Sequence, residues 1–414
     1  MSTVYVVGGG LAGLGAAVAL AQEGRRIVLI EGAPQAGGRC RSYFDAALGG
    51  VIDNGNHLVL SGNTSVQAYL AAIGARDALA GPATAIFDFA DVRDNRRWTL
   101  RPNESALAWW IFAEDRRVPD TGPYDYLALV QLLAAGADKR IEDVIRCDGP
   151  LWERLLEPFL LAVLNTEPRI ASAKLAGAVI AESLAKGGRA YRPRIAHPTL
   201  AAAFVDPALA FLKSKGADIR IGQRVRALGF EDERLTALQL PNESIALAAA
   251  DRVILAVPPW AATELVPGLV APSEFRAIVN AHFAIARPPG APMITGVLGG
   301  AAQWIFAFDD RISITVSGAD AIVDDDREAL ARRFWADVAK VLHLPDALPP
   351  WQVVKERRAT FAATPAQAKR RPPAATRWPN LFLAGDWTDT GLPATIEGAI
   401  RSGHKAAALA QRGG

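Results

Sequence analysis

The sequence predicts an α/β protein with two lobes, and three observations support this prediction. Residues 4–31 have the pattern of a strand, a helix and a second strand, the unit from which parallel sheets are built. Residues 380–407 have the pattern of another strand and helix, so the two chain ends are expected to share one lobe. Tryptophan first occurs at position 98, and aromatic residues then cluster over 98–160 and 304–308. These middle stretches are expected to build the other lobe.

A glycine-rich loop follows the first predicted strand. The buried strand Val4–Val7 leads into G-x-G-x-x-G at Gly8, Gly10 and Gly13, and an Ala- and Leu-rich helix begins there. In such a motif the first glycine permits a tight turn, the second lets the backbone approach a pyrophosphate, and the third lets helix and strand pack closely. The helix N-terminus offers free N–H groups and a positive dipole end to the phosphates. The motif therefore predicts a dinucleotide site.

An acidic residue at the end of the second strand supports the same interpretation. The strand Ile27–Ile30 runs into Glu31, 18 residues after Gly13, where a carboxylate can accept hydrogen bonds from an adenosine ribose. The alternative is an Ala- and Gly-rich helix beside an incidental acid. Because strand, loop, helix, strand and acid occur in the required order, dinucleotide binding is favoured.

The segment Gly37-Gly38-Arg39 indicates which dinucleotide is bound. A glycine pair followed by arginine brings a second set of backbone N–H groups and a guanidinium to a diphosphate. Simple nicotinamide dehydrogenases usually lack this segment, so FAD is favoured over NAD. The alternative is a plain turn that carries a surface arginine.

The C-terminal region is expected to complete the cofactor site. Residues 380–386 are predicted to be a strand that ends at Gly385-Asp386, and ligands in open α/β sheets bind at the carboxyl ends of strands. A helix is expected to start near Thr395, which would be its N-cap, and to run through Ile396. Its N-terminal dipole can stabilise negative charge on a reduced flavin. Glu397, in the first turn, is expected to complement the dipole or face the substrate rather than bind the flavin.

Two stretches in the middle of the chain are assigned to the same lobe. Residues 217–221 and 223–225 are predicted to form a β-hairpin arm that returns to the dinucleotide site. Residues 251–257 are predicted to be a strand that ends at a pair of prolines.

Composition and charge exclude several classes of protein. Lys and Arg (45) nearly balance Asp and Glu (43), so nothing favours a nucleic-acid partner. The cysteines Cys40 and Cys147 and the five histidines are scattered, so neither a disulfide scaffold nor a metal site is expected. Glycine and proline interrupt the uncharged runs, so neither a signal peptide nor a membrane-spanning helix is expected. A cytoplasmic protein is expected, and peripheral contact with the inner face of the membrane stays open.

These motifs together resemble the superfamily of FAD-dependent amine oxidases and phytoene desaturases. The mid-chain pattern D-x-V-I-L-A-x-P, which begins at Asp251, belongs to the same resemblance. Within the superfamily the chain is most similar to the hydroxysqualene dehydroxylase family of bacterial hopanoid biosynthesis. The stretches that carry this similarity are residues 37–42, 53–57, 164–166, 303–306, 359–365 and 385–399.

The resemblance implies a discontinuous, Rossmann-like FAD-binding lobe and a substrate-binding lobe. The FAD lobe is expected over residues 1–79, 196–261 and 351–414, and the substrate lobe over 80–195 and 262–350. The residues expected to contact FAD are Gly8, Gly10, Gly13, Glu31, Gly38, Arg39, Val225 (through its backbone, on the adenine side), Gly385, Asp386, Thr395 and Ile396.

The resemblance also implies a reaction on a long isoprenoid. The expected reaction is the reductive removal of an allylic hydroxyl from hydroxysqualene to give squalene, with reduced FAD as the hydride source and an unidentified electron donor that reduces it. Departure of hydroxide at neutral pH requires a proton donor. His57 is the first candidate, and Asp53 and Glu397 are weaker ones. A structural His57 that bonds to backbone is the alternative.

Three other functions stay open. A carotenoid-type desaturase or a flavin amine oxidase would use the same fold with electrons flowing in the opposite direction. A non-catalytic isoprenoid carrier would keep the substrate lobe without redox chemistry. The intact cofactor motifs argue against a carrier.

Aromatic residues are expected to line the substrate lobe, although each is equally suited to an ordinary core. They are Trp152, Phe159, Trp304, Phe306 and Phe308. Residues 106–113 combine three aromatic side chains with the nearby Arg116 and Arg117, so this stretch either lies in a membrane interface or ends a buried helix. A substrate of about 30 carbons, at roughly 0.8 kcal/mol each, stays in lipid and favours membrane contact. The basic run 369–371 is expected to be a solvated loop.

Overall fold

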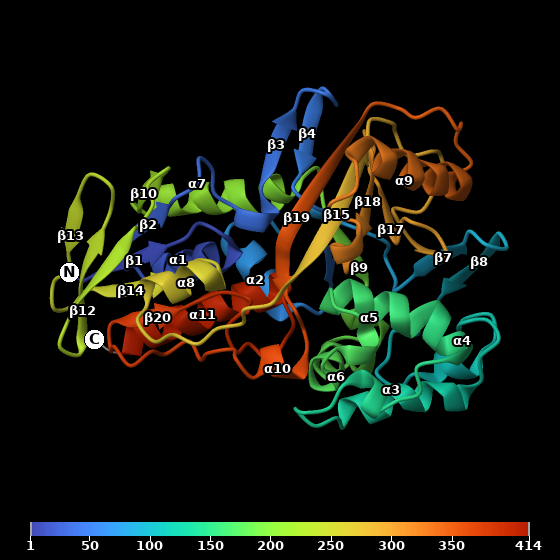
Figure 1. Cartoon of the computed structure of the whole chain (residues 1–414), viewed down its shortest axis with the longest axis horizontal. Helices are drawn as coiled ribbons and strands as arrows, with labels where there is room; N and C mark the ends of the chain where they lie inside the picture. Colours follow the sequence, from blue (N-terminus) through green and yellow to red (C-terminus); the bar gives the residue numbers. More distant parts are fainter. Residues whose placement is uncertain (1, 413–414) are drawn as a thin grey trace.

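The computed structural model describes residues 2–412 and shows two lobes side by side (Figure 1). The first lobe holds a parallel sheet with the strand order β10-β2-β1-β14-β20. Its strands are β1 (Thr3–Val7), β2 (Arg26–Glu31), β10 (Asp218–Ile221), β14 (Arg252–Leu255) and β20 (Leu381–Leu383). Apart from residues at their ends, such as Thr3 and Arg252, the inner strands are apolar, and helices and loops cover the sheet on both faces. The predicted two-lobed α/β fold is confirmed.

The first and last helices of the chain pack against one another in this lobe. The helices of the lobe are α1 (Leu11–Gln22), α2 (Thr64–Ala72), α7 (Asp206–Ser214), α8 (Pro259–Leu265) and α11 (Ile396–Arg412). Contact between α1 and α11 requires a glycine, because a Cβ atom at Gly403 would lie 2.2 Å from the carbonyl oxygen of Ala12. The two ends of the chain therefore form one unit, as predicted.

Three smaller antiparallel sheets connect the lobes or extend from them. They consist of β3 (Ser42–Asp45) with β4 (Gly50–Asp53), of β5 (Leu58–Leu60), β9 (Pro193–Ala196) and β6 (Leu79–Ala80), and of β11 (Ala227–Glu231), β12 (Arg234–Gln239) and β13 (Ser244–Ala246). The β3–β4 hairpin projects from the molecule between the two lobes (Figure 1).

The second lobe is built on a seven-stranded, mainly antiparallel sheet with the order β19-β15-β18-β17-β16-β7-β8. Its strands are β7 (Phe87–Asp91), β8 (Arg96–Leu100), β15 (Phe275–Phe283), β16 (Ile294–Leu298), β17 (Trp304–Ala307), β18 (Ile312–Val316) and β19 (Trp351–Phe361). The amphipathic helix α9 (Arg327–Leu342) covers one face with its buried side. A helical layer lies next to the sheet and contains α3 (Leu127–Leu133), α4 (Gly149–Leu151), α5 (Glu157–Leu164) and α6 (Ala173–Glu182). The short helix α10 (Pro365–Ala368) follows β19.

The predicted hairpin over residues 217–225 is wrong. The strand β10 is a parallel edge strand that pairs with β2, and residues 223–225 form no strand. After Gly222, which has a φ of +75°, the chain turns toward the end of β2, where the N–H of Gln223 donates to the carbonyl oxygen of Glu31 at 2.8 Å. The open edge of β2 provides hydrogen-bond partners for β10, so no second hairpin strand is needed.

The strand β19 lies in the sheet of the second lobe, whereas the expected boundaries place it in the FAD lobe. Residues 351–361 were expected in the FAD lobe, but β19 pairs antiparallel with β15 along almost its whole length. Its residues then lead directly into the cofactor side of the molecule, so β19 connects the lobes (Figure 1). The strand β9 crosses the expected boundary between residues 195 and 196. It pairs with β5 and with β6, and β6 itself crosses the boundary between residues 79 and 80.

Within residues 2–412, no helix combines the length and the apolar character that crossing a bilayer requires.

Candidate active site

The G-x-G-x-x-G loop connects β1 to α1, and two of its glycines are required by close backbone contacts. Gly8 has a φ of +111°, and a Cβ atom there would lie 2.4 Å from the carbonyl oxygen of Ala256. A Cβ atom at Gly13 would lie 1.9 Å from the carbonyl oxygen of Gly8. At Gly10, by contrast, a Cβ atom would meet nothing within 4 Å. The N-terminus of α1 therefore faces open space at Gly10, where a pyrophosphate can approach the backbone.

The segment 37–39 packs directly on this loop. The N–H of Gly37 donates to the carbonyl oxygen of Gly9 at 2.8 Å, and Gly10 and Gly37 form a β-bridge. A Cβ atom at Gly38, which has a φ of +56°, would lie 3.3 Å from the Cα of Gly10. We call residues 8–13 and 37–39 together the cofactor cradle. The structure brings these two predicted phosphate-binding segments into contact.

Glu31 is held rigidly at the end of β2. Its Oε2 accepts a hydrogen bond from the N–H of Gly9, and its Oε1 accepts one from the N–H of Ala33, both at 2.6 Å. A carboxylate has about four acceptor positions, so capacity remains for the hydroxyls of a ribose. The geometry fits the predicted contact to the adenosine half of FAD.

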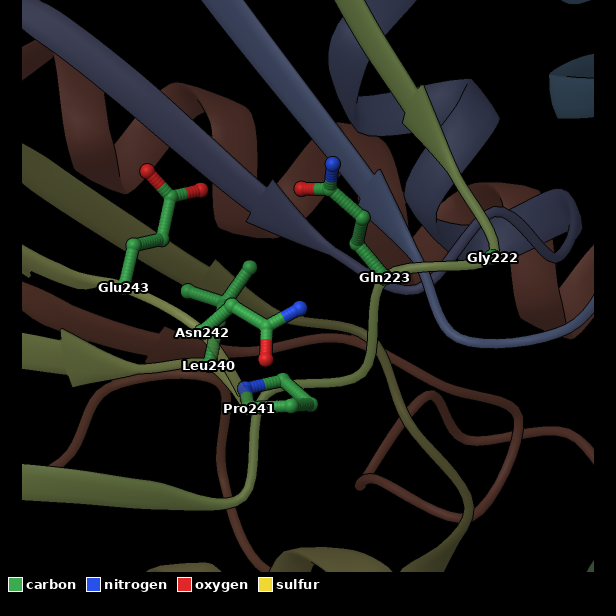
Figure 2. Close-up of a pocket in the computed structure, with 6 residues that line it drawn as sticks. All are labelled: Gly222, Gln223, Leu240, Pro241, Asn242 and Glu243. Carbon is green, nitrogen blue, oxygen red and sulfur yellow. The ribbon is translucent and has the colours of Figure 1, made fainter.

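A pocket lies at the edge of the parallel sheet (Figure 2), and the N–H of Gln223 in its lining donates to the carbonyl oxygen of Glu31. Its volume is about 350 Å³, and it is lined by residues 222–223 on one side and 240–243 on the other. The side chain of Val225, two residues further along the chain, is buried at 7% exposure. The expected contact between the backbone of Val225 and the adenine side of the cofactor stays a prediction.

An ion pair joins the cradle to the C-terminal region. The Nη2 of Arg39 lies 2.6 Å from the Oδ2 of Asp386, and the Nη1 of Arg39 donates to the carbonyl oxygen of Ala359. Asp386 is buried, whereas the side chain of Arg39 is 39% exposed. The guanidinium is thus oriented by Asp386 but keeps an accessible face for a phosphate.

The loop after β20 and the start of α11 form the other wall of the site. Helix α11 begins at Ile396, and Thr395 is its N-cap, with its Oγ1 accepting from the N–H of Gly398 at 3.0 Å. Gly385 is required at its position because it has a φ of +152° and a Cβ atom would lie 2.3 Å from the Nε1 of Trp387. The strand, loop and helix predicted for residues 380–407 are confirmed.

Arg371 supports the same loop, and for this residue the expectation of a solvated basic run is wrong. Its Nη2 donates to the carbonyl oxygens of Asp386 at 3.1 Å and Thr388 at 2.5 Å, and to the Oγ1 of Thr390 at 2.8 Å. Burial lowers the pKa of Arg371 to about 10, which leaves the guanidinium charged at neutral pH. The carbonyl groups that it binds follow β20, so sequence distance concealed this role.

Asp53 is engaged in a buried ion pair between the lobes. Its Oδ2 lies 3.2 Å from the Nη2 of Arg311, and its Oδ1 accepts from the Ser42 hydroxyl at 2.6 Å and the Leu200 N–H at 2.8 Å. Burial raises the pKa of Asp53, while these hydrogen bonds and Arg311 act in the opposite direction. All contacts of Asp53 are structural, which argues against the expected catalytic role.

Glu397 is also occupied by structural contacts. Its two carboxylate oxygens accept hydrogen bonds from the N–H groups of Ser65 and Val66, both at 3.0 Å, and its Oε1 lies 3.1 Å from Arg401. The side chain is 3% exposed. Glu397 therefore caps the N-terminus of α2 and does not face a substrate.

His57 is the catalytic candidate that lies next to the cofactor residues. It is half-buried in the loop after β4, close enough to Arg39 and Asp386 for both charges to affect its titration. Burial lowers the pKa of His57 to about 4, and the positive charge of Arg39 acts in the same direction. The imidazole is therefore neutral at pH 7, where it can donate a hydrogen bond but does not carry an extra proton.

Sequence comparison shows which family has this arrangement. Residues 11–410 match the family of flavin containing amine oxidoreductases. The hydroxysqualene dehydroxylase of Rhodopseudomonas palustris is 52% identical over 408 residues, which cover 98% of each chain. That of Sinorhizobium fredii is 49% identical over 407 residues, again 98% of each chain. The chain belongs to the hydroxysqualene dehydroxylase family.

A solved structure supports the fold of this family member. Cyclohexylamine oxidase from Brevibacterium oxydans IH-35A superposes with a TM-score of 0.73 over 99% of each chain, at 16% sequence identity. Because the family is a flavin family and the cradle has room for a pyrophosphate at Gly10, FAD is the cofactor. Residues 8–13 and 37–39 would hold its diphosphate, Glu31 its ribose, and the start of α11 its flavin end.

A carboxylate that the sequence did not single out also lies where the lobes meet. Glu356 on β19 is half-buried, and its Oε2 accepts a hydrogen bond from the side-chain amide of Asn54 at 3.4 Å. The charge of Glu356 is also felt by Arg39. No motif marks Glu356, because β19 reaches the cofactor side only through the tertiary fold of this hydroxysqualene dehydroxylase family member.

The aromatic residues expected in the substrate lobe gather in one apolar cluster. Trp152, Trp304, Phe306 and Phe308 are all at most 8% exposed, and Phe159 packs against the same cluster. The ring of Phe89 lies edge-on to Trp304 at 5.9 Å, and the indole Nε1 of Trp304 is buried without a hydrogen-bond partner among residues 2–412. These side chains supply an apolar, water-poor environment next to the seven-stranded sheet.

Proposed function

We propose that this chain converts hydroxysqualene to squalene, the reaction for which its relatives are named. The observation that carries the proposal is the 52% identity over 98% of both chains, combined with a cradle that retains every glycine the cofactor requires. In the reaction the C–O bond breaks, a hydride forms a new C–H bond, and the hydroxyl leaves as water after taking up a proton. The cofactor cradle would hold FAD, which in its reduced form would supply the hydride, and an unidentified two-electron donor would reduce it again.

The apolar cluster of the second lobe is proposed to hold the isoprenoid chain. Trp304, Phe306 and Phe308 would exclude water from the carbon that loses its hydroxyl, since positive charge on that carbon would otherwise be trapped by solvent. Exclusion of water also strengthens every hydrogen bond to the leaving group.

His57 is proposed to act on the leaving hydroxyl, as the sequence suggested. Because its pKa is near 4, His57 at pH 7 donates a hydrogen bond from a neutral ring. Glu356 is a second candidate, because it is a half-buried carboxylate beside Asn54 that makes no structural contact comparable with those of Asp53 and Glu397. The variants His57→Gln, His57→Phe and Glu356→Gln distinguish them.

The mechanism is tested by the rates of these variants. If His57 donates to the hydroxyl, His57→Phe lowers kcat about a hundredfold while His57→Gln, which keeps an N–H donor, retains most of it. If Glu356 supplies the proton, Glu356→Gln lowers kcat, because the amide cannot give up the proton of a carboxylic acid. Flavin absorbance of each variant controls for loss of the cofactor.

The function itself is tested by anaerobic single turnover. The FAD-loaded protein is photoreduced and mixed with hydroxysqualene, and the products are analysed by mass spectrometry. Formation of squalene is the expected result. A lengthened polyene would instead identify a desaturase, peroxide release with amines an amine oxidase, and a purified protein without flavin a carrier.

A further inference from the structure

An apolar patch lies at the outer edge of the second lobe, in the segment that contains α3 (Figure 1). Its members lie between residues 107 and 133, and the exposed fraction of each is between 42% and 85%. They are Leu107, Trp109, Phe112, Tyr124, Leu127, Val130 and Leu133. This apolar patch contains more than half of the large apolar side chains that are exposed among residues 2–412. Such a concentration on a folded protein marks an interaction surface.

The patch is built on a rigid base. Two short 3-10 helices, η2 (Trp109–Phe112) and η3 (Pro123–Tyr126), contact one another, and η3 also contacts α3. Trp110 and Tyr126 pack edge-to-face at 5.2 Å and are almost fully buried. Neighbouring side chains such as Phe112, which is 70% exposed, consequently point away from the protein. The outward orientation is imposed by packing.

The patch also lacks charge where it is most apolar. Residues 126–137 contain no Asp, Glu, Lys or Arg, although Asp125 and Asp138 flank the stretch. A charged group at such a surface would cost several kcal/mol in a hydrocarbon environment. The segment can therefore enter an apolar phase at its centre while its ends stay in water.

A polar pocket adjoins the patch at Trp109. Its volume is about 300 Å³, and its lining includes the guanidinium side chains of Arg101 and Arg116. Arg116 lies 4.7 Å from the centre of the Trp109 ring. Glu104 also lines the pocket, but its carboxylate pairs with Arg192 rather than with either arginine. Two cationic groups therefore face a pocket at the rim of an apolar surface, which suits a phosphate that is attached to an acyl chain.

We propose that the apolar patch and the Arg101–Arg116 pocket form a docking surface for a phospholipid bilayer. The exposed apolar side chains enter the acyl region, Trp109 and Tyr124 lie at the interface, and the two guanidiniums bind lipid phosphates. This inference rests on the proposed function, because a hydroxylated hydrocarbon of hydroxysqualene's size resides in lipid. A second copy of the chain fits less well, because a symmetric contact would bring like-charged arginines together.

The surface is tested with the FAD-loaded full-length chain and vesicles of pure phosphatidylcholine in a flotation assay. The double variant Phe112→Ser/Val130→Ser is expected to bind at least tenfold more weakly, since exposed apolar area drives the insertion. The matched control is Phe44→Ser, since Phe44 is 67% exposed but lies on the β3–β4 hairpin. Arg101→Gln/Arg116→Gln is expected to weaken binding severalfold and to reduce its dependence on salt.

Each outcome supports or overturns the proposal. Wild-type protein that fails to float, or equal losses in Phe44→Ser and the patch variant, would overturn it. A lipid-free dimer that Phe112→Ser/Val130→Ser dissociates would assign the patch to a second copy. Turnover of hydroxysqualene dispersed in detergent distinguishes the docking surface from the proposed function. If both proposals hold, Phe112→Ser/Val130→Ser retains this turnover. Vesicle binding without squalene formation would overturn only the proposed function and not the docking surface.

Discussion

The cofactor cradle and the apolar patch are both poor in charge, yet they differ in what surrounds each residue. In the cradle, Gly8 and Gly13 lie so close to backbone atoms that a single added carbon would collide with them. In the patch, Phe112 and Tyr124 extend into solvent. Local composition therefore does not separate a buried binding loop from a docking surface. The presence or absence of contacts within the chain separates them.

The largest expected effect distinguishes two glycines of the cradle. Gly13→Val is expected to give no folded protein, because its Cβ atom would lie 1.9 Å from the carbonyl oxygen of Gly8. Gly10→Val is expected to fold with a normal unfolding midpoint but without flavin, because its side chain would occupy the open space that the pyrophosphate needs. Circular dichroism and flavin absorbance measure both. A yellow Gly10→Val protein would contradict the position assigned to the cofactor.

A second prediction concerns the buried ion pair between the lobes. Asp53→Asn should lower the free energy of unfolding by about 3 kcal/mol, because Arg311 would lose its buried counter-charge and keep only its ion pair with the exposed Asp310. The double variant Asp53→Asn/Arg311→Met, which keeps an acceptor for the Leu200 N–H and removes the buried cation, is expected to recover part of this loss. Urea unfolding measures both proteins. A catalytic Asp53 would instead leave stability unchanged and abolish turnover.

Adjacent leucines in α3 test the comparison most directly. Leu132→Ala should lower the free energy of unfolding by about 2 to 5 kcal/mol, since Leu132 is completely buried. Leu133→Ala should change it by less than about 0.5 kcal/mol, since Leu133 is 42% exposed and belongs to the patch. Equal losses in urea unfolding would show that Leu133 packs within the chain.

The smallest expected effect is a gradual loss of stability in acid. His282 is fully buried, its Nδ1 lies 2.7 Å from the Ser313 hydroxyl, and burial lowers its pKa to about 3. Below pH 6.5 the unfolded chain binds a proton that the folded chain does not, so stability decreases as the pH falls toward 3. The slope is at most about 1.4 kcal/mol per pH unit for this residue. His282→Asn should reduce the slope in urea unfolding between pH 6.5 and 4, and an unchanged slope would contradict this assignment.

The sequence alone was sufficient for features that depend on neighbouring residues. The βαβ unit, the glycines at 8, 10 and 13, the N-cap Thr395 and the strand before Gly385 follow from local backbone geometry and hydropathy, which act over a few residues. The family resemblance followed from the same motifs, and the comparisons confirmed it. Of the residues named as FAD contacts outside the cradle, Glu31 and Asp386 bond directly to it, and the contacts of the whole set to FAD stay a prediction.

The tertiary structure decided the features that join distant parts of the chain. Asp53 lies 258 positions from its partner Arg311, and Glu397 lies 332 positions from Ser65, so neither capping nor pairing could be read from local patterns. The same holds for Arg371, which supports the loop after β20, and for β19, which lies in the seven-stranded sheet. Exposure of the apolar patch was equally undetermined, because a run such as 127–133 has the same composition whether a neighbouring element covers it or not. Burial depends on how whole elements pack, whereas hydropathy indicates only whether each residue would favour a buried position.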